Sequence, residues 1–183
     1  LLKKERQDIH AQVAKVMEHL FEGRLSEFYE TLAYHFAQGR SVNKAVEYLV
    51  KAGEKSLARY AVEEAHEYYK KAFDILGPKE NKTEEEIKLL IDMLNSWGYV
   101  YYYLGDMKVF IDLFNAHKNL LESLGDRSRL GMFYAWLGIA SFMSGRQKDS
   151  YDYLRSALEL GESSGAQKVI GYACTWLPWA CAQ

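Results

Sequence analysis

A spacing of forty residues recurs among the glycines in the second half of this sequence. Three glycines are each followed by another one forty positions later: Gly98 by Gly138, Gly105 by Gly145, and Gly125 by Gly165. The same spacing takes Gly131 to Gly171 and Trp136 to Trp176, so a third copy begins before the sequence ends. A fixed period of this length is the signature of a repeat protein, in which stacked copies of one supersecondary unit share a continuous core.

The repeated unit is helical. Proline occurs only at 78 and 178, and apolar residues recur at intervals of three or four, which is the helical period. Glycine or proline marks the breaks, and Thr83-Glu84-Glu85-Glu86 has the form of a capping box that starts a helix. These signals predict helices over 3–21, 25–38, 42–58, 61–76, 84–104, 107–123, 127–144, 147–162 and 166–182. The short connections make neighbouring helices antiparallel.

One segment, 99–103, consists of Tyr and Val, residue types that favour strands. The surrounding apolar residues keep helical spacing, and no second strand is available to pair with the segment. We therefore expect residues 98–103 to be helical.

The unit resembles the tetratricopeptide repeat, a helical hairpin with an aromatic residue, Leu-Gly and Tyr on its first helix, and Ala, an aromatic and Ala on its second. The matching residues are Leu94, Trp97-Gly98 and Tyr101; Tyr134, Leu137-Gly138 and Ser141; Tyr29, Leu32-Ala33 and Phe36; Ala45, Leu49 and Ala52; and Ala65, Tyr69 and Ala72. Phe110 and Ser150 depart from the expected Ala, Pro178 departs from the Gly, and the unit is longer than the usual 34 residues.

This resemblance implies an all-α fold of TPR-like antiparallel helical hairpins, stacked in a right-handed superhelical solenoid. The array would cover 24–183, with units near 26–59, 46–79 (overlapping), 91–126 and 131–165 and a truncated unit from 171. Residues 1–23 would form an N-terminal helix that closes a preceding domain.

A finer resemblance covers 9–76. The stretches 9–14, 32–36 and 45–54 look like the segment after the ATPase core in large bacterial signalling proteins. There a STAND-type ATPase is joined to an adenylate or guanylate cyclase, a kinase or a transcriptional regulator. The resemblance implies that the chain is a sensing or scaffolding arm, and we expect both of its ends to be internal to a longer protein.

Composition excludes several classes of partner. With 23 basic and 25 acidic residues the net charge is -2, which gives no field that would attract nucleic acid or an anionic membrane. The longest apolar stretches, 97–104 and 139–143, fall short of the ~20 residues of a membrane span. No signal peptide precedes the first helix, so we expect a cytoplasmic protein. Cys174 and Cys181 match neither a metal spacing nor a redox pair and are predicted to be small buried hydrophobes.

The sequence carries no recognisable catalytic motif. It has no phosphate-binding loop, and its five histidines show no zinc-binding spacing, so we expect neither cofactor nor metal. His66, beside several glutamates, is assigned to a solvated helix face, and His35, between Tyr34 and Phe36, to an interhelical contact. The chain itself is therefore not expected to be an enzyme.

In a stacked array the first helices of successive units line a concave groove that binds partners. The expected groove residues are Asn95, Tyr99, Tyr102, Tyr103, Trp136, Ile139, Phe142, Met143 and Trp176. Asn95 is the polar residue expected to bond a peptide backbone. Such an aromatic stripe suits an apolar helix or an extended peptide, but a stripe at helical spacing is equally consistent with a packed core.

Two functions remain open. The favoured one is a protein–protein interaction or scaffolding module of a signalling protein, which binds a protein or peptide. The alternative is a small-molecule sensor that regulates a neighbouring ATPase, cyclase or DNA-binding domain. The apolar face of the last helix, with Trp176 and Trp179, is expected either to form a homodimer or to pack back over the groove.

Overall fold

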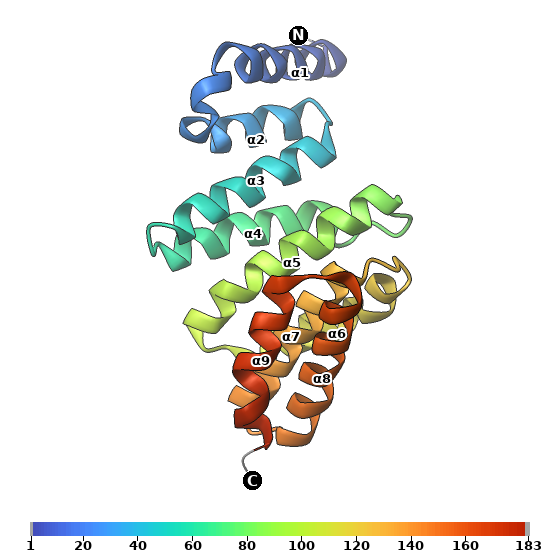
Figure 1. Cartoon of the computed structure of the whole chain (residues 1–183). Helices are drawn as coiled ribbons and strands as arrows, with labels where there is room; N and C mark the ends of the chain where they lie inside the picture. The colour runs from blue at the N-terminus through green and yellow to red at the C-terminus, as the bar shows by residue number, and fades with distance from the viewer. Residues whose placement is uncertain (1, 182–183) are drawn as a thin grey trace. The chain divides into compact units, whose positions relative to one another are not determined.

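The chain is all-α. The computed structural model describes residues 2–181, and within them all regular structure is helical (Figure 1). The elements in order are α1 (Lys3–Leu20), the 3-10 helix η1 (Glu22–Glu27), α2 (Tyr29–Gln38), α3 (Val42–Leu57), α4 (Val62–Leu76), α5 (Glu84–Leu104), α6 (Met107–Glu122), α7 (Arg127–Met143), α8 (Gln147–Ser164) and α9 (Gln167–Cys181). The prediction that residues 98–103 are helical is confirmed, because they lie within α5. Each helix in this described part is too short or too polar to cross a membrane.

Four of the glycines predicted to end helices do so by adopting a left-handed conformation. Their φ angles lie between 69° and 77°: Gly105, Gly125, Gly145 and Gly165. Gly39 also ends a helix, but its φ is -81°, and its neighbour Arg40 adopts the left-handed conformation instead. A Cβ on Gly39 would lie 2.8 Å from the backbone nitrogen of Ala11. Gly39 therefore permits the close approach of α1 and α2 rather than the turn itself.

The helix predicted over 25–38 begins at Tyr29, four residues later than expected. Arg24 has non-helical angles (φ -147°, ψ 35°), which interrupts the helical path after α1. The rings of Phe21 and Phe28 stack across this turn with their centroids 4.2 Å apart. The turn therefore has a small aromatic contact of its own, which joins the end of α1 to the start of α2.

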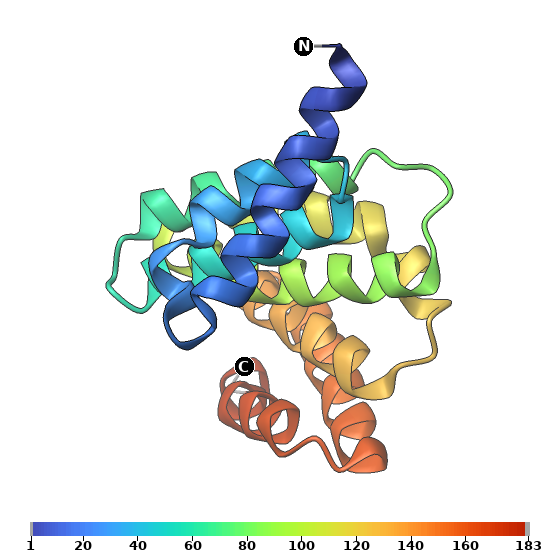
Figure 2. The same ribbon diagram turned by 90° about the horizontal axis from the view of Figure 1, so that it is seen from above.

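The chain divides into two compact units, residues 1–93 and 94–183, with the boundary inside α5. In the first unit α1 packs on α2, α2 on α3, and α3 on α4 (Figures 1 and 2). Small residues occupy these contacts, since Ala45, Ala52, Ala65 and Ala72 are completely buried. The small residues recognised in the sequence thus lie where helices of this unit approach closely.

In the second unit α7 packs against both α8 and α9, and α8 also packs against α9. The buried residues Ala135, Ala157, Val169 and Ala173 form the centre of this three-helix contact. On the other side of α7, the rings of Phe114 and Phe133 stack with centroids 4.4 Å apart, which joins α6 to α7.

The start of α5 has the predicted capping box. The Glu86 backbone N–H donates to the Thr83 hydroxyl at 3.3 Å, and the Thr83 backbone N–H donates to a Glu86 carboxylate oxygen at 2.9 Å. The Glu86 carboxylate is almost fully buried and also accepts from the Lys79 ammonium at 2.6 Å. The Lys79 ammonium and the Thr83 hydrogen bond hold the pKa of Glu86 below its usual range. The helix start is therefore fixed by a charged network as well as by backbone preference.

The prediction that both cysteines are buried is wrong, because Cys174 and Cys181 are exposed. Each follows a buried alanine, Ala173 or Ala180, by one residue. One helical step turns the side chain by about 100°, which is enough to move it from the packed face of α9 to solvent.

His35 makes the interhelical contact that the sequence indicates. Its Nδ1 lies 3.0 Å from Nδ1 of His10 on α1, and the Tyr34 ring meets both imidazoles edge-on. This hydrogen bond needs one nitrogen with a proton and one without, so double protonation breaks it. Burial, and after it the neighbouring His10, lowers the pKa of His35 below its ordinary value of 6.5.

Acid is therefore expected to weaken the packing of α1 on α2. Because the folded state lowers the pKa of His35, the unfolded chain binds more protons near pH 6. The contribution of His35 is present above pH 6.5 and is lost as the pH falls through the folded pKa. The free energy of unfolding, measured with urea at pH 7, 6 and 5, should fall less with decreasing pH in His35→Asn than in the wild type. Exposed His19→Asn is the control. If the free energy of unfolding of His35→Asn falls as steeply with pH as that of the wild type, His35 is not the source of the acid sensitivity.

Two helical glycines are expected to respond oppositely to alanine. A Cβ on Gly138 would lie 2.6 Å from Cγ of the fully buried Leu154, so Gly138→Ala should lower the free energy of unfolding by about 1–3 kcal/mol. A Cβ on Gly171 would meet no atom within 4 Å, so Gly171→Ala should raise it by about 0.5–1 kcal/mol through helix propensity. Urea titration of both variants measures the difference. Equal effects would contradict the packing described for α7 and α8.

Candidate functional site

Three aromatic residues from three helices of the second unit converge on one another. Tyr99 of α5 meets Trp136 of α7 with ring centroids 4.8 Å apart, and Tyr172 of α9 lies 5.8 Å from Trp136. The hydroxyl oxygens of Tyr99 and Tyr172 are 2.6 Å apart and share a hydrogen bond. Burial, and after it this bond, raises the pKa of Tyr172 to about 12, so the Tyr172 hydroxyl keeps its proton at neutral pH. We call Tyr99, Trp136 and Tyr172 the aromatic triad.

Trp136 belongs to the core, whereas Tyr99 and Tyr172 are half-buried at its edge. Trp136 is 3% exposed, and Ile139, one turn further along α7, is 2% exposed. The indole lies directly on Gly98, where a Cβ would come within 2.7 Å of the ring. In this conformation Trp136 and Ile139 are not accessible to a partner. For these two residues the structure agrees with the alternative interpretation of the stripe as core.

Asn95 is occupied by the chain's own backbone. Its side-chain amide donates to the carbonyl oxygen of Arg129, in the first turn of α7, at 3.3 Å. Its Oδ1 is buried and has no hydrogen-bond partner among the described residues. The amide expected to bond a peptide backbone therefore joins α5 to α7 instead.

The remaining predicted residues form an exposed surface beside the aromatic triad. We call this set the aromatic surface: Tyr102 and Tyr103 of α5, Phe142 and Met143 of α7, and Trp176 and Trp179 of α9. The indole of Trp176 touches both Tyr102 and Phe142, with centroids 6.4 and 5.6 Å apart. Tyr103 is 55% exposed, Met143 44% and Trp179 63%. Half-buried Phe142 and Trp176 thus lie against the exposed Tyr102, and Trp176 and Trp179 both belong to the apolar face of the last helix that the sequence indicated.

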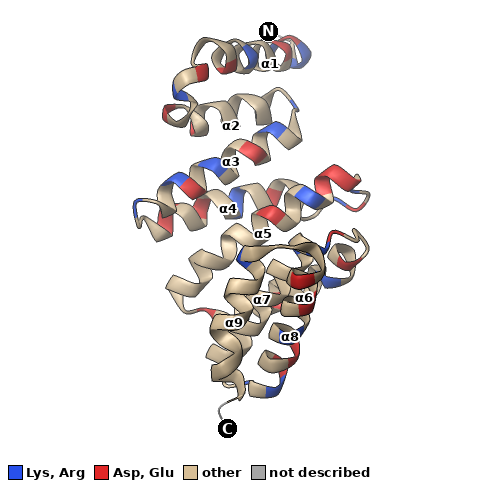
Figure 3. Cartoon of the chain, viewed as in Figure 1, with Lys and Arg blue, Asp and Glu red and all other residues tan. Residues whose placement is uncertain are grey.

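The helices α7 and α9, which carry most of the aromatic surface, have few charged residues (Figure 3). The charged residues of α7 are Arg127 and Arg129, both in its first turn, and the one in α9 is Lys168. Residues 94–104 of α5 carry none. The Lys168 ammonium lies 5.6 Å from the centre of the Tyr99 ring, which places it at the aromatic triad. The chemistry offered by the aromatic surface is therefore aromatic and thioether contact, with two phenol hydroxyls.

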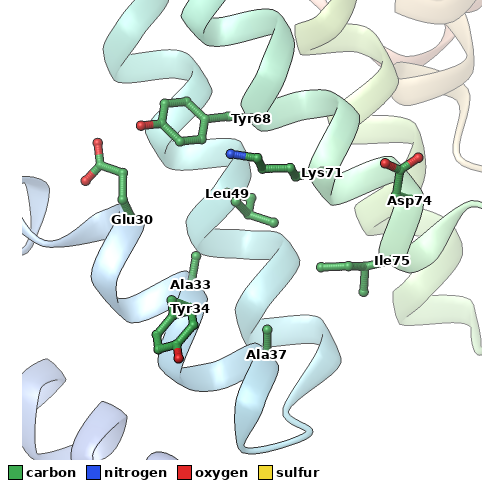
Figure 4. Close-up of a pocket in the computed structure, with 9 residues that line it drawn as sticks. All are labelled: Glu30, Ala33, Tyr34, Ala37, Leu49, Tyr68, Lys71, Asp74 and Ile75. Atoms are coloured by element: carbon green, nitrogen blue, oxygen red, sulfur yellow. The ribbon is translucent and has the colours of Figure 1, made fainter.

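The first unit contains a pocket that the sequence did not reveal. It has a volume of about 420 Å³ and lies between α2, α3 and α4 (Figure 4). Its lining from α2 recurs at helical intervals, with Glu30, Ala33, Tyr34 and Ala37 on one face. This spacing is visible in the sequence, but the residues from α4 that complete the pocket are known only once the helices are packed.

Comparison with protein-family models and with curated proteins gave no match to this chain. Among the described residues no group of three or more His, Cys, Asp or Glu is arranged to hold a metal ion. The candidate sites therefore rest on the geometry of the aromatic surface and of the pocket.

Replacing each of two tryptophans with alanine tests which of them belongs to the core and which to the surface. Trp136→Ala removes a buried ring that packs on Gly98, so the free energy of unfolding should fall by about 3–5 kcal/mol. Trp179→Ala removes a ring that is mostly in solvent and should change it by about 0.5 kcal/mol or less. Thermal and urea unfolding measure both variants. If the Trp136→Ala chain is as stable as the wild type, Trp136 is not a core residue, and the prediction that it belongs to the binding surface stands.

Proposed function

We propose that this chain is a non-catalytic interaction module that binds an apolar peptide or helix on its aromatic surface. The observation that carries the proposal is the set of ring contacts from exposed Tyr103 to Tyr102, and from Trp176 to Tyr102 and Phe142, in helix segments without charged residues. Aromatic residues and Met are enriched at the centres of protein interfaces, where charged residues are depleted. A contiguous exposed group of this kind on a folded chain marks an interaction site.

The contacts beneath the aromatic surface hold its rings in place before a partner binds. Trp176 is held between Tyr102 and Phe142, and the adjoining aromatic triad is closed by the Tyr99–Tyr172 hydrogen bond. Rings whose positions are already fixed lose little side-chain freedom when a partner binds. The partner we propose is a helix with an apolar face, or an extended peptide with alternating apolar side chains.

We further propose that the helices form TPR-like hairpins in a right-handed superhelical array, within a cytoplasmic signalling protein of the STAND-ATPase type. The packing of α7 on both α8 and α9, and the forty-residue recurrence of left-handed glycines, support this arrangement. In that setting the module would connect a partner protein to a neighbouring ATPase, cyclase, kinase or transcriptional regulator.

Binding can be tested with peptides selected from a random displayed library against the folded wild-type chain. Selected peptides should be rich in aromatic and aliphatic residues. Tyr103→Ala should weaken their binding by about tenfold, since one well-placed aromatic contributes on the order of 1–2 kcal/mol. Fluorescence anisotropy of a labelled selected peptide measures the change.

Tyr151→Ala is the matched control, because Tyr151 is exposed on α8 and lies outside the aromatic surface. Equal binding by Tyr103→Ala and Tyr151→Ala would contradict the proposal. Sedimentation equilibrium tests whether the partner is a second copy of the chain. If the wild type is a dimer and Trp179→Lys is a monomer, the aromatic surface forms a homodimer.

A further inference from the structure

Two histidines from different helices of the first unit face each other through the same ring nitrogen. His10 lies on α1 and His35 on α2, and their Nδ1 atoms are 3.0 Å apart. Both side chains are partly exposed, so a small solute can reach the two nitrogens. Neutral imidazole nitrogen is the commonest metal ligand in proteins. The pair does not show as a ligand spacing in the sequence because the two histidines are 25 residues apart.

The geometry of the pair fits two neighbouring ligands of one metal ion. Two nitrogens that each lie about 2.0–2.1 Å from an ion are about 2.9 Å apart at a right angle and about 3.3 Å apart at a tetrahedral angle. The observed 3.0 Å lies nearer the first value. An ion on the lone-pair axes of both rings would hold the ring centres about 4.5–5.2 Å apart, and the observed separation is 5.0 Å. An ion can therefore bind both nitrogens with little movement of either helix.

Neighbouring contacts hold the two imidazoles in this position. The Tyr34 ring meets both edge-on, with centroids 5.6 Å from His10 and 5.4 Å from His35. One residue after His10, Ala11 packs against Gly39, where a Cβ would lie 2.8 Å from the Ala11 backbone nitrogen. This close approach fixes the separation of α1 and α2 beside the pair. Ligands whose positions are already set lose little freedom when an ion binds.

We propose that His10 and His35 form a two-histidine site for a divalent transition metal ion of the Ni²⁺ and Cu²⁺ kind, which joins α1 to α2. Imidazole suits these ions, and both accept ligands at right angles. The histidine that donates the present hydrogen bond carries its proton on Nε2 in the bound state, so that both Nδ1 lone pairs are free for the ion. The described residues add no third His, Cys, Asp or Glu to the pair, so the remaining positions on the ion are left to water.

The helix that the ion would hold is α1. Binding through both histidines requires α1 to lie on α2, so the ion stabilises this packing by mass action. The site lies in residues 1–93 and is independent of the aromatic surface, so the failure of either proposal leaves the other standing.

The probe is Ni²⁺, because the exposed thiols of Cys174 and Cys181 would reduce Cu²⁺. It is titrated at pH 7 into the full, isotopically labelled chain without an affinity tag, and the backbone amide resonances are followed. The amides around His10 on α1 and around His35 on α2 should broaden or shift together, with one common affinity. The same titration with Mg²⁺, which prefers oxygen ligands, should leave them unchanged.

Two single variants test whether both imidazoles hold the ion. His10→Asn and His35→Asn should each weaken Ni²⁺ binding by about tenfold or more, because each removes one of two preorganised ligands. His19→Asn is the matched control, since His19 is exposed on the same helix as His10. Ni²⁺ should also raise the midpoint of urea unfolding in the wild type and in His19→Asn, but not in the other two variants. Amide spectra without metal show whether each variant is folded.

The proposal is overturned by three results. One is the absence of any response at the amides around His10 and His35 with millimolar Ni²⁺. Another is a wild-type response limited to one of the two helices, which is binding to a single histidine. The third is equal Ni²⁺ affinity in the wild type, His10→Asn and His35→Asn, which is an adventitious ion only.

Discussion

The packing of the Trp136 indole on the backbone of Gly98 is the contact on which the second unit depends. A side chain on Gly98 would come within 2.7 Å of the indole, so α5 and α7 can approach this closely only because that residue is glycine. The indole in turn meets Tyr99 of α5 and Tyr172 of α9. One close approach therefore sets the separation of three helices, and a shift of Trp136 would be transmitted to both neighbours because a packed core does not deform continuously.

This arrangement explains why one aromatic stripe contains both core and surface. Toward the start of the stripe, Tyr99 and Tyr172 cover Trp136 and close over it with a hydrogen bond. Further along the same helices, no tyrosine–tyrosine hydrogen bond of this kind is present among the described residues. Tyr103, Met143 and Trp179 remain exposed to solvent there. The buried end positions the exposed end, which is the preorganisation that a binding surface needs.

Local signals in the sequence predicted local structure well. The left-handed glycines, the Thr83–Glu86 capping box and the helical state of 98–103 each depend on residues within a few positions of one another. Exposure was harder to predict, because it depends on what another helix covers. Trp136 and Tyr103 both belong to the same predicted stripe, yet one is buried by Tyr99 and Tyr172 and the other is not.

Polar partners and pockets were unpredictable for the same reason. The amide of Asn95 bonds a carbonyl 34 residues away in the sequence, and only the packed helices bring the two together. The pocket of the first unit is built from α2, α3 and α4, and its aliphatic and charged residues share no motif in the sequence.

Two glycines that share the forty-residue spacing have different surroundings. Gly131 and Gly171 are forty residues apart in the sequence. A Cβ on Gly131 would lie 2.9 Å from a methyl group of Val169, so this glycine lets α9 pack on α7. At Gly171 the same face of the helix instead borders a hollow of about 280 Å³, lined by Lys168, Tyr172, Thr175 and Trp176. The spacing in the sequence is therefore the same for both glycines, and the neighbouring helices decide whether the glycine permits close packing, as at Gly131, or leaves a face open, as at Gly171.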